Sequence, residues 1–277
     1  ANKLDYSNNR SYNLYINGNT GFTTEFFYKR NNNSGSSRQV IFDLWNSGSV
    51  IETSGSAYGR FRIEVSPGIS GSENLFTIFL TSGSNGLGSS GITIGDSLNL
   101  SNSVWNQYSF NIINTGSNLK IELFKNGELN STIITGSSIA EVTGAYIATL
   151  GSLVTNHTSG SSTALGYGKL SGSLDEFRFW KQKRTDKDIK RFWFTQIGGG
   201  TNSDESNTNL GVYYKFNEGI QSTISSISPY DTVCLDYSGR ITNGSLINYS
   251  YDVRVSGSAI ESRFSNAIEK GDPIIYK

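Results

Sequence analysis

Carboxylates are the side chains in this sequence whose spacing could support hydrolytic chemistry. Hydrolysis of a glycosidic bond uses a pair of them, one as the acid and one as the base or nucleophile. On a strand, such a pair must occupy alternate positions, because successive side chains point to opposite faces. Asp175 and Glu176 are adjacent and are expected to face opposite ways, and Glu122 and Glu128 lie on either side of a predicted turn. We therefore expect the chain not to be an enzyme.

Histidine and cysteine each occur once, as His157 and Cys234. A zinc helix of the HExxH type and a two-histidine metal centre both need a second histidine. A single cysteine excludes a disulfide within the chain and a cysteine-rich metal site. We expect Cys234 to be buried as a small apolar side chain.

Two long polar loops carry residues suited to sugar recognition, which needs an aromatic surface for the ring and polar groups for the hydroxyls. The loop at 152–168 holds Asn156, His157 and Tyr167, and the loop at 31–38 holds three asparagines and Arg38. Either loop could form the rim of a ligand site. The alternative is that both are solvated turns, because Asn and Ser populate turns for backbone reasons alone.

Charge is balanced, with 23 Lys plus Arg against 23 Asp plus Glu, so no net field attracts nucleic acid or an anionic membrane. The basic run at 181–191 includes Asp186 and Asp188 and is interpreted as a solvated helix face. No segment approaches the ~18 apolar residues of a membrane-spanning helix, and no signal peptide is visible. We expect neither nucleic-acid binding nor membrane insertion.

Alternation of apolar and polar residues predicts many short strands in a chain with 31 glycines and three prolines. The predicted strands are 20–28, 39–45, 58–65, 75–80, 105–113, 119–124, 129–135, 145–150 and 172–180. Asn126-Gly127 is the preferred pair for a type I′ turn and predicts a hairpin. Strands at this spacing favour an all-β fold, a two-sheet antiparallel sandwich.

The strand at 172–180 leads directly into the one helix that the sequence predicts. Strict alternation places Leu174 on the same face as Glu176, Arg178 and Trp180, opposite Asp175, Phe177 and Phe179.

Thr185 and Asp188 have the spacing of a helix N-cap and its capping-box partner. Ile189, Phe192 and Trp193 then form an apolar stripe that should lie on the sheet. The glycines at 198–200 are expected to end the helix.

Composition divides the chain into a sandwich domain at 1–197, a Gly/Ser/Asn linker at 198–209 and a β-rich segment at 210–277. The last segment either packs on the sandwich or leads to a further domain, and alternation at 212–216 suits an added strand. The stretch at 82–97 is expected to be a long loop. The chain holds no methionine, and we expect it to be a fragment of a longer polypeptide.

Several of these stretches resemble a known family. The sequence GSLDEFRFW at 172–180, followed by RTDKDI at 184–189, resembles the closing strand and helix of laminin-G-like and concanavalin A-like jelly rolls. WNQYSF at 105–110, with the hairpin around Asn126-Gly127, is similar to an earlier part of the same domains. The segments 210–219 and 235–246 resemble a stretch that flanks such jelly rolls in bacterial surface proteins and in virion proteins of tailed bacteriophages.

The resemblance implies a concanavalin A-like jelly roll with one short helix and a β-rich C-terminal extension. Some relatives hydrolyse β-glucans with the pattern E-x-D-x-x-E, which is absent here. Others, the pentraxins among them, bind calcium through acidic loops. By that resemblance Asp175 could hold a single structural calcium ion; otherwise it bonds to loop backbone or pairs with Arg178. No other cofactor is expected.

The leading hypothesis is a non-catalytic binding or adhesion module that recognises cell-surface or extracellular carbohydrate. It would be displayed on a larger virion or surface protein, at the virion surface or outside the cell, beside other domains or subunits. The alternative is a purely structural assembly component that uses 210–277 for attachment. The second alternative, a glycoside hydrolase or lyase, would need carboxylates that converge in a groove.

Overall fold

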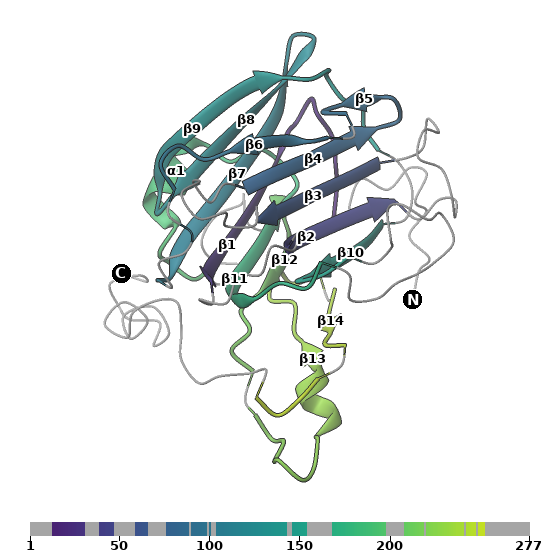
Figure 1. Ribbon diagram of the computed structural model, residues 1–277, viewed down its shortest axis with the longest axis vertical. Helices are drawn as coiled ribbons and strands as arrows, with labels where there is room; N and C mark the ends of the chain where they lie inside the picture. The colour runs from purple at the N-terminus through teal and green to yellow at the C-terminus, as the bar shows by residue number, and fades with distance from the viewer. Residues whose placement is uncertain are drawn as a thin grey trace.

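Two antiparallel sheets packed face to face form the body of the protein, as seen in the computed structural model (Figure 1). The structure describes residues 13–30, 39–46, 59–65, 76–88, 90–98, 100, 104–142, 146–153, 168–197, 208–218, 220–240, 242–247 and 249–252. The first sheet has the order β12-β11-β1-β7-β8-β9, and the second has the order β10-β2-β3-β4-β5, with β6 also pairing with β4. The expected all-β jelly-roll sandwich is confirmed.

The elements have the following bounds: β1 Phe22–Arg30, β2 Gln39–Asn46, β3 Gly59–Val65, β4 Phe76–Ser82, β5 Asn85–Gly86, β6 Ile92–Ile94, β7 Asn106–Thr115, β8 Asn118–Lys125, β9 Glu128–Thr135, β10 Tyr146–Leu150, β11 Gly172–Trp180, α1 Asp186–Phe192, β12 Leu210–Tyr214, η1 Pro229–Thr232, β13 Val233–Cys234 and β14 Gly244–Ser245.

Aromatic side chains from both sheets fill the space between the layers. Phe76 of the second sheet meets Phe110 of the first edge to face, with ring centroids 5.2 Å apart. Phe61 meets Phe22 in the same manner at 5.0 Å. These four rings are fully buried, and edge-to-face pairs add to the free energy of burial. The alternating residues of the predicted strands therefore build one continuous core.

The β8–β9 hairpin confirms the turn predicted from Asn126-Gly127. Both residues have positive φ, 49° and 79°, as a type I′ turn requires. The expectation of a long loop at 82–97 is wrong, because this stretch contains β5 and β6, both paired with β4. Each strand is only two or three residues long, too short for alternation to identify.

A β-bulge in β11 changes the predicted faces of that strand. Glu25 pairs with Arg178 but Phe27 pairs with Asp175, so β11 carries one extra residue at this point, and Glu176 has φ of 52°. Beyond the bulge the alternation is reversed. Leu174 consequently packs against the main core that contains Phe177, and its predicted placement on the opposite face is wrong.

The N-terminus of α1 is capped as the sequence predicts. Thr185 Oγ1 accepts a hydrogen bond from Asp188 N at 3.1 Å and donates to Asp188 Oδ2 at 2.5 Å. The helix ends at Phe192, so the expected extension to the glycines at 198–200 is wrong. Phe192 is 37% exposed and only Ile189 of the predicted stripe is fully buried. The chain leaves the helix after Phe192, and Thr195 and Gln196 then bond to buried side chains of β11.

The C-terminal segment begins as part of the sandwich, because β12 pairs with β11 along its length. Position 211 in β12 has no room for a side chain. A Cβ atom on Gly211 would lie 1.7 Å from the backbone carbonyl oxygen of Asn13. The chain then continues into a projecting extension, residues 215–252 (Figure 1). Asp236 fastens the extension to β12, since its carboxylate accepts hydrogen bonds from Tyr213 N at 3.0 Å and Thr242 N at 2.9 Å. Cys234 is buried as expected.

Neither α1 nor any other helix in the described ranges has the length and apolar character needed to cross a membrane.

Lys181 lies at the junction between the sandwich and the extension and makes folding depend on pH. Burial lowers its pKa to about 8, with a further lowering by Arg240. Below pH 8 the amine is charged in both the folded and unfolded states, so the cost of holding that charge at the junction is fully present. Between pH 8 and about 10.5 the folded state loses its proton first, and stability rises.

Replacing the amine removes this cost. We expect Lys181→Met to raise the free energy of unfolding by about 1–2 kcal/mol at pH 7, and the gain to shrink as pH rises towards 10. Urea unfolding at pH 7 and pH 10 measures both values. Lys187→Met, on the exposed surface of α1, is the control and should show no such pH-dependent gain. A gain that stays constant with pH contradicts the assignment.

Candidate functional site

Asn156, His157 and Tyr167, the residues predicted to bind ligand, lie outside the described residues, as does the loop at 31–38. The structure does place the strand ends from which both loops start. The loop at 154–167 leaves after Leu153 and returns at Gly168, and the loop at 31–38 joins Arg30 to Gln39.

The two predicted loops start side by side at one end of the sandwich. Val40 N donates to Gly168 O at 2.9 Å, and Ser171 N donates to Gln39 Oε1 at 3.2 Å. Arg30 pairs with Gly172 across the β1–β11 ladder. These bonds join both ends of the first loop to the returning end of the second. The sequence gives no sign of this meeting, because the two loops are more than 100 residues apart.

A third stretch, 66–75, starts at the same end. Gln39 pairs with Val65 at the end of β3, and Val65 pairs with Phe76 at the start of β4. We call this end of the sandwich the loop end, defined by the strand-terminal residues Arg30, Gln39, Val65, Phe76 and Gly172.

Trp105 lies at the loop end, directly before β7, and is partly exposed. The next residue, Asn106, pairs with Tyr28 of β1. Lys29 Nζ lies 5.2 Å from the centroid of the Trp105 ring, within the range of a cation–π contact. An indole beside an ammonium group can stack on a sugar ring while the amine donates to a hydroxyl or carboxylate. An aromatic residue between a polar stretch and a strand is the sequence signal for this position, but ordinary core residues show it too.

Beneath this rim two polar side chains are buried. Burial raises the pKa of Tyr28 to about 12, although nearby Arg30 lowers it. Tyr28 and Arg30 are 2% and 1% exposed. Both side chains therefore support the loop end from within, and the Tyr28 phenol stays uncharged near neutral pH.

The outward-facing charges of the second sheet form ion pairs with one another. Arg60 contacts Asp43 through two hydrogen bonds of 2.7 and 2.8 Å. On β3, Arg62 Nε lies 2.5 Å from Glu64 Oε1, and the Arg62 guanidinium stacks on the Phe79 ring at 4.0 Å. All four charged side chains are buried. Carboxylates held in this way stabilise the sheet and are poor general acids or bases.

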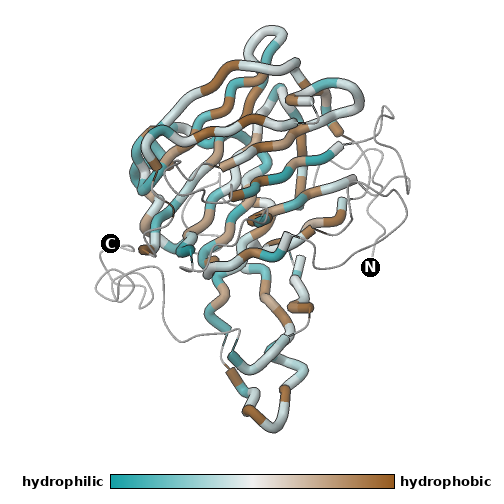
Figure 2. Tube along the Cα trace, in the orientation of Figure 1, coloured by the Kyte–Doolittle hydropathy of each residue, from teal (hydrophilic) through white to brown (hydrophobic). Residues whose placement is uncertain are grey.

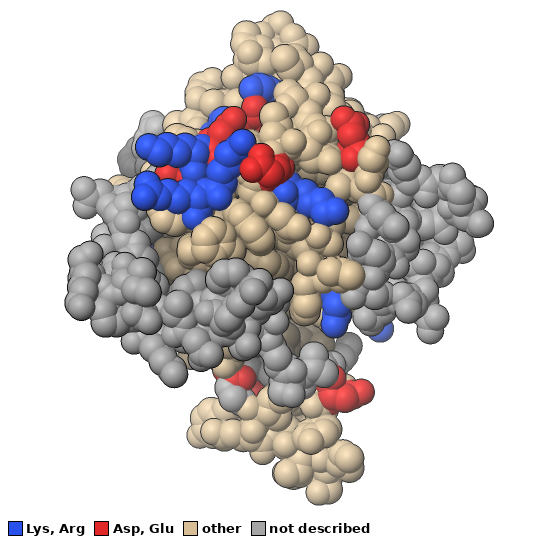
Figure 3. All heavy atoms as spheres, turned by 90° about the vertical axis from the view of Figure 1, so that its left-hand side faces the viewer, with Lys and Arg blue, Asp and Glu red and all other residues tan. Residues whose placement is uncertain are grey.

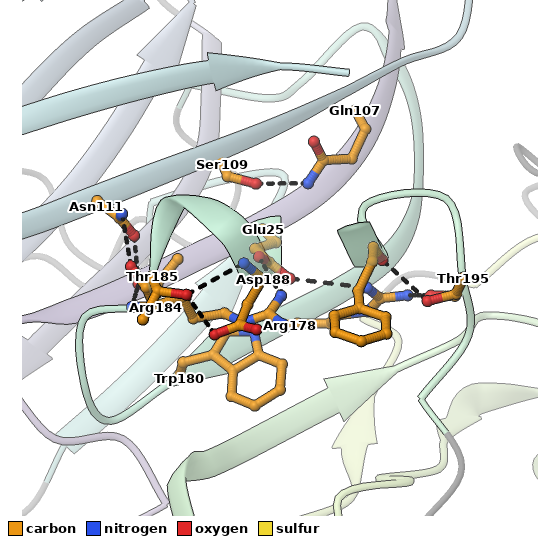
Figure 4. Close-up of polar contacts among 12 residues, drawn as sticks. Glu25, Gln107, Ser109, Asn111, Arg178, Trp180, Arg184, Thr185, Asp188 and Thr195 are labelled. Carbon is orange, nitrogen blue, oxygen red and sulfur yellow. Dashed lines mark hydrogen bonds and ion pairs between the residues drawn. The ribbon is translucent and has the colours of Figure 1, made fainter. Parts of the chain in front are cut away.

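The first sheet holds a second buried cluster on the face that α1 covers (Figure 4). Arg178 of β11 bridges two carboxylates, with Nη2 2.9 Å from Glu176 Oε2 and Nη1 3.7 Å from Glu25 Oε2. Glu25 also accepts from Arg184 at 2.8 Å and from the indole of Trp180 at 3.1 Å. The sequence offered Asp175 as one possible partner of Arg178, whereas Arg178 forms ion pairs with Glu176 and Glu25.

The segment after α1 is fixed by the same cluster, which explains why the helix stops at Phe192. Thr195 O accepts a hydrogen bond from Arg178 Nη2 at 2.5 Å, and Gln196 Nε2 donates to Glu176 Oε1 at 3.0 Å.

Tyr213 of β12 completes the cluster by donating its hydroxyl to Glu176. Burial raises the pKa of Tyr213 well above its ordinary value, so the phenol remains a donor. For Arg178 burial lowers the pKa, but the negative charges of Glu176 and Glu25 raise it by more, and the guanidinium stays charged. Two carboxylates that are 1–2% exposed and bonded to cations have no access to a substrate. The cluster is suited to holding strands together.

Asp175, the candidate calcium ligand, is 8% exposed, and its Oδ1 accepts a hydrogen bond from Glu176 N at 3.0 Å. This bond lies at the β-bulge and stabilises the positive φ of Glu176. Within the described ranges no three His, Cys, Asp or Glu side chains are grouped so as to hold a metal ion. The local role visible for Asp175 is therefore to bond to the backbone, one of the alternatives predicted from the sequence.

No family model and no curated protein matches the chain. Solved structures with a similar fold include a candidate carbohydrate-binding protein from Bacteroides ovatus, at 15% identity and a TM-score of 0.47, where the match covers 82% of this chain and 54% of that one. They also include a heptameric SAP-like pentraxin from Limulus polyphemus, at 13% identity and a TM-score of 0.44, covering 84% and 86%. Mouse laminin alpha1 domains LG4-5 match at 11% identity and a TM-score of 0.39, covering 63% and 40%.

The chain thus spans about half of the Bacteroides ovatus protein. The laminin-G-like and concanavalin A-like resemblance of the sequence is confirmed as a likeness of fold, with two antiparallel sheets packed face to face. Identities this low say nothing about the ligand of this chain.

Removing the bridging cation tests the structural role of the carboxylates. We expect Arg178→Met to lower the free energy of unfolding by roughly 3–5 kcal/mol, because it leaves Glu25 and Glu176 buried with part of their compensation gone. Arg191→Met, on the exposed side of α1, should change it by less than about 0.5 kcal/mol. Urea unfolding gives both values. A loss below about 1 kcal/mol for Arg178→Met would show that the cluster is not needed for stability.

Proposed function

We propose that this chain is a non-catalytic module that binds carbohydrate at the loop end of the sandwich. The observation that carries the proposal is the meeting of the strand ends from which the two polar loops start, joined by the bonds of Val40 and Ser171. Residues on loops held by a rigid scaffold are a common way to build a binding site. The loop at 154–167 supplies Asn156, His157 and Tyr167 as the proposed ligand-binding residues.

Trp105 and Lys29 extend this proposal to the edge of the loop end. The indole offers an apolar face for a pyranose ring, and the nearby ammonium group offers a donor for its oxygens. Both side chains are partly exposed. The carboxylates nearest in character to a catalytic pair, Glu25 and Glu176, are buried in the Arg178 cluster, which favours binding over hydrolysis.

The proposed setting is an extracellular or virion-surface protein of which this chain is one part. A module that binds weakly gains useful affinity when several copies act together on one surface. A structural calcium ion near Asp175 belongs to the same proposal, and adding or removing calcium tests it separately.

A glycan array probed with and without calcium tests the function. We expect binding that is lost in the triple variant N156A/H157A/Y167A and weakened about tenfold or more in Trp105→Ala, because an aromatic side chain that stacks on the sugar contributes strongly to a small interface. Tyr251→Ala is the matched control, since this aromatic is 43% exposed but lies on the extension. Thermal unfolding of each variant shows that the fold is kept.

Absence of binding across a broad array, with the fold intact, would contradict the carbohydrate proposal and favour the structural alternative. Binding that survives the triple variant but not Trp105→Ala would move the site from the loop at 154–167 to the edge of the loop end.

A further inference from the structure

The far end of the extension exposes an unusual set of apolar side chains. We call residues 220–230 the tip loop. Within it Ile224 is 88% exposed, Tyr230 75%, Ile227 46% and Ile220 42%. Figure 2 shows hydrophobic residues gathered at the lower end of the extension, away from the sandwich core. Single exposed apolar residues are ordinary, but four on one short loop indicate a contact surface.

The tip loop is ordered with its polar groups inside and its apolar groups outside. Asp231 is 1% exposed and accepts hydrogen bonds from Gln221 N at 2.9 Å and from Ser222 Oγ at 2.5 Å. Ser222 Oγ accepts in turn from Ser228 N at 2.9 Å. The backbones of Thr223 and Ser226 also bond to each other. A loop held in this way presents its isoleucines without a large entropic cost on binding.

The charge of the surrounding chain restricts what can cover this loop. Residues 216–239 contain three acidic residues, Glu218, Asp231 and Asp236, and no Lys or Arg. An anionic bilayer or a nucleic acid attracts basic segments, so neither fits this surface. An apolar protein surface bordered by basic side chains is a suitable partner for the tip loop.

Such a surface exists on the same protein, at α1. Residues 181–192 hold six Lys or Arg and two Asp. We define the α1 patch as Leu129, Lys187, Lys190, Arg191 and Phe192. Leu129 is 46% exposed and Phe192 37%, and the three cations are exposed around them. Figure 3 shows Lys and Arg side chains gathered on one face of the molecule, with a few acidic side chains between them.

One cation of the α1 patch, Lys190, forms an ion pair at the surface. Lys190 lies 3.0 Å from Glu128 of β9, next to Leu129 in the chain. Both members of this ion pair are exposed, and pairs of that kind contribute little, so Lys190 can exchange this partner for another.

We propose that the tip loop of one copy docks on the α1 patch of a second copy. The two surfaces differ, so the contact is heterologous and joins copies head to tail. Ile224, Ile227 and Tyr230 would cover Phe192 and Leu129. Of the acidic residues, the partly exposed Glu218 and Asp236 would face the cations of α1, whereas Asp231 stays buried inside the tip loop. This interface is independent of the loop end and does not rest on the proposed carbohydrate function.

Sedimentation of the full chain across about 1–300 µM tests self-association. We expect the weight-average mass to rise above that of one chain with concentration, and the rise to be smaller at about 1 M NaCl, where charge contacts are screened. A single-chain mass at every concentration in low salt would overturn the proposal.

Two variants test which surfaces meet. I224S/I227S disables the tip loop, and K187E/R191E disables the α1 patch; all four positions are exposed, so the fold should be kept, as circular dichroism can show. We expect each variant alone to associate at least about tenfold more weakly. Ile134→Ser, a 60% exposed position on β9 outside both surfaces, is the control and should associate as the unchanged chain does.

Mixing the two variants separates the head-to-tail contact from other arrangements. One variant keeps an intact α1 patch and the other an intact tip loop, so together they can form one good interface and should give a one-to-one dimer that grows no further. A tip-to-tip contact would give no such mixed dimer, because each mixed pair would contain one disabled tip, and K187E/R191E alone would associate fully. Failure of the mixture to form a dimer, or full association of either variant alone, would overturn the proposed pairing.

Discussion

The buried ion-pair cluster around Arg178 joins more parts of this protein than any other contact described above. Its members come from three neighbouring strands: Glu25 from β1, Glu176 and Arg178 from β11 and Tyr213 from β12. The same guanidinium also bonds to Thr195 beyond α1. Charges this deeply buried are tolerable only when each has its partner, so the strands, the helix and the return of the chain are positioned together.

This cluster also connects the two halves of the molecule. β12 lies at the edge of the first sheet because Tyr213 meets Glu176, and the extension begins where β12 ends. Asp236 then ties the extension back to the Tyr213 backbone. The extension is consequently an arm fixed to the sandwich by polar contacts, with its apolar residues turned outward at the tip loop.

The protein thus presents three separate surfaces: the loop end and the α1 patch on the sandwich, and the tip loop on the extension. The loop end gathers three interstrand stretches and the partly exposed Trp105, a geometry suited to a small polar ligand. The tip loop and the α1 patch are apolar surfaces with opposite charge around them, a combination suited to protein contact. A module that binds a surface glycan gains avidity when copies are linked, so the two proposed activities are compatible although neither requires the other.

The sequence by itself determined the local structure. Alternation located most strands, Asn126-Gly127 specified its hairpin through positive φ, and Thr185 with Asp188 marked the start of α1. These features depend on residues close together in the chain, and their physics is contained in a short window.

Tertiary structure decided the rest, because the deciding contacts are distant in sequence. The bulge at Glu176 moved Leu174 to the core face, and the pull of Arg178 on Thr195 ended α1 at Phe192. The meeting of the two predicted ligand loops depends on strand pairing between β1 and β11 and on the bond of Val40 to Gly168. The alternation of apolar and polar residues indicates which face of a strand a residue prefers. Its partner on the neighbouring strand depends on how the whole chain packs.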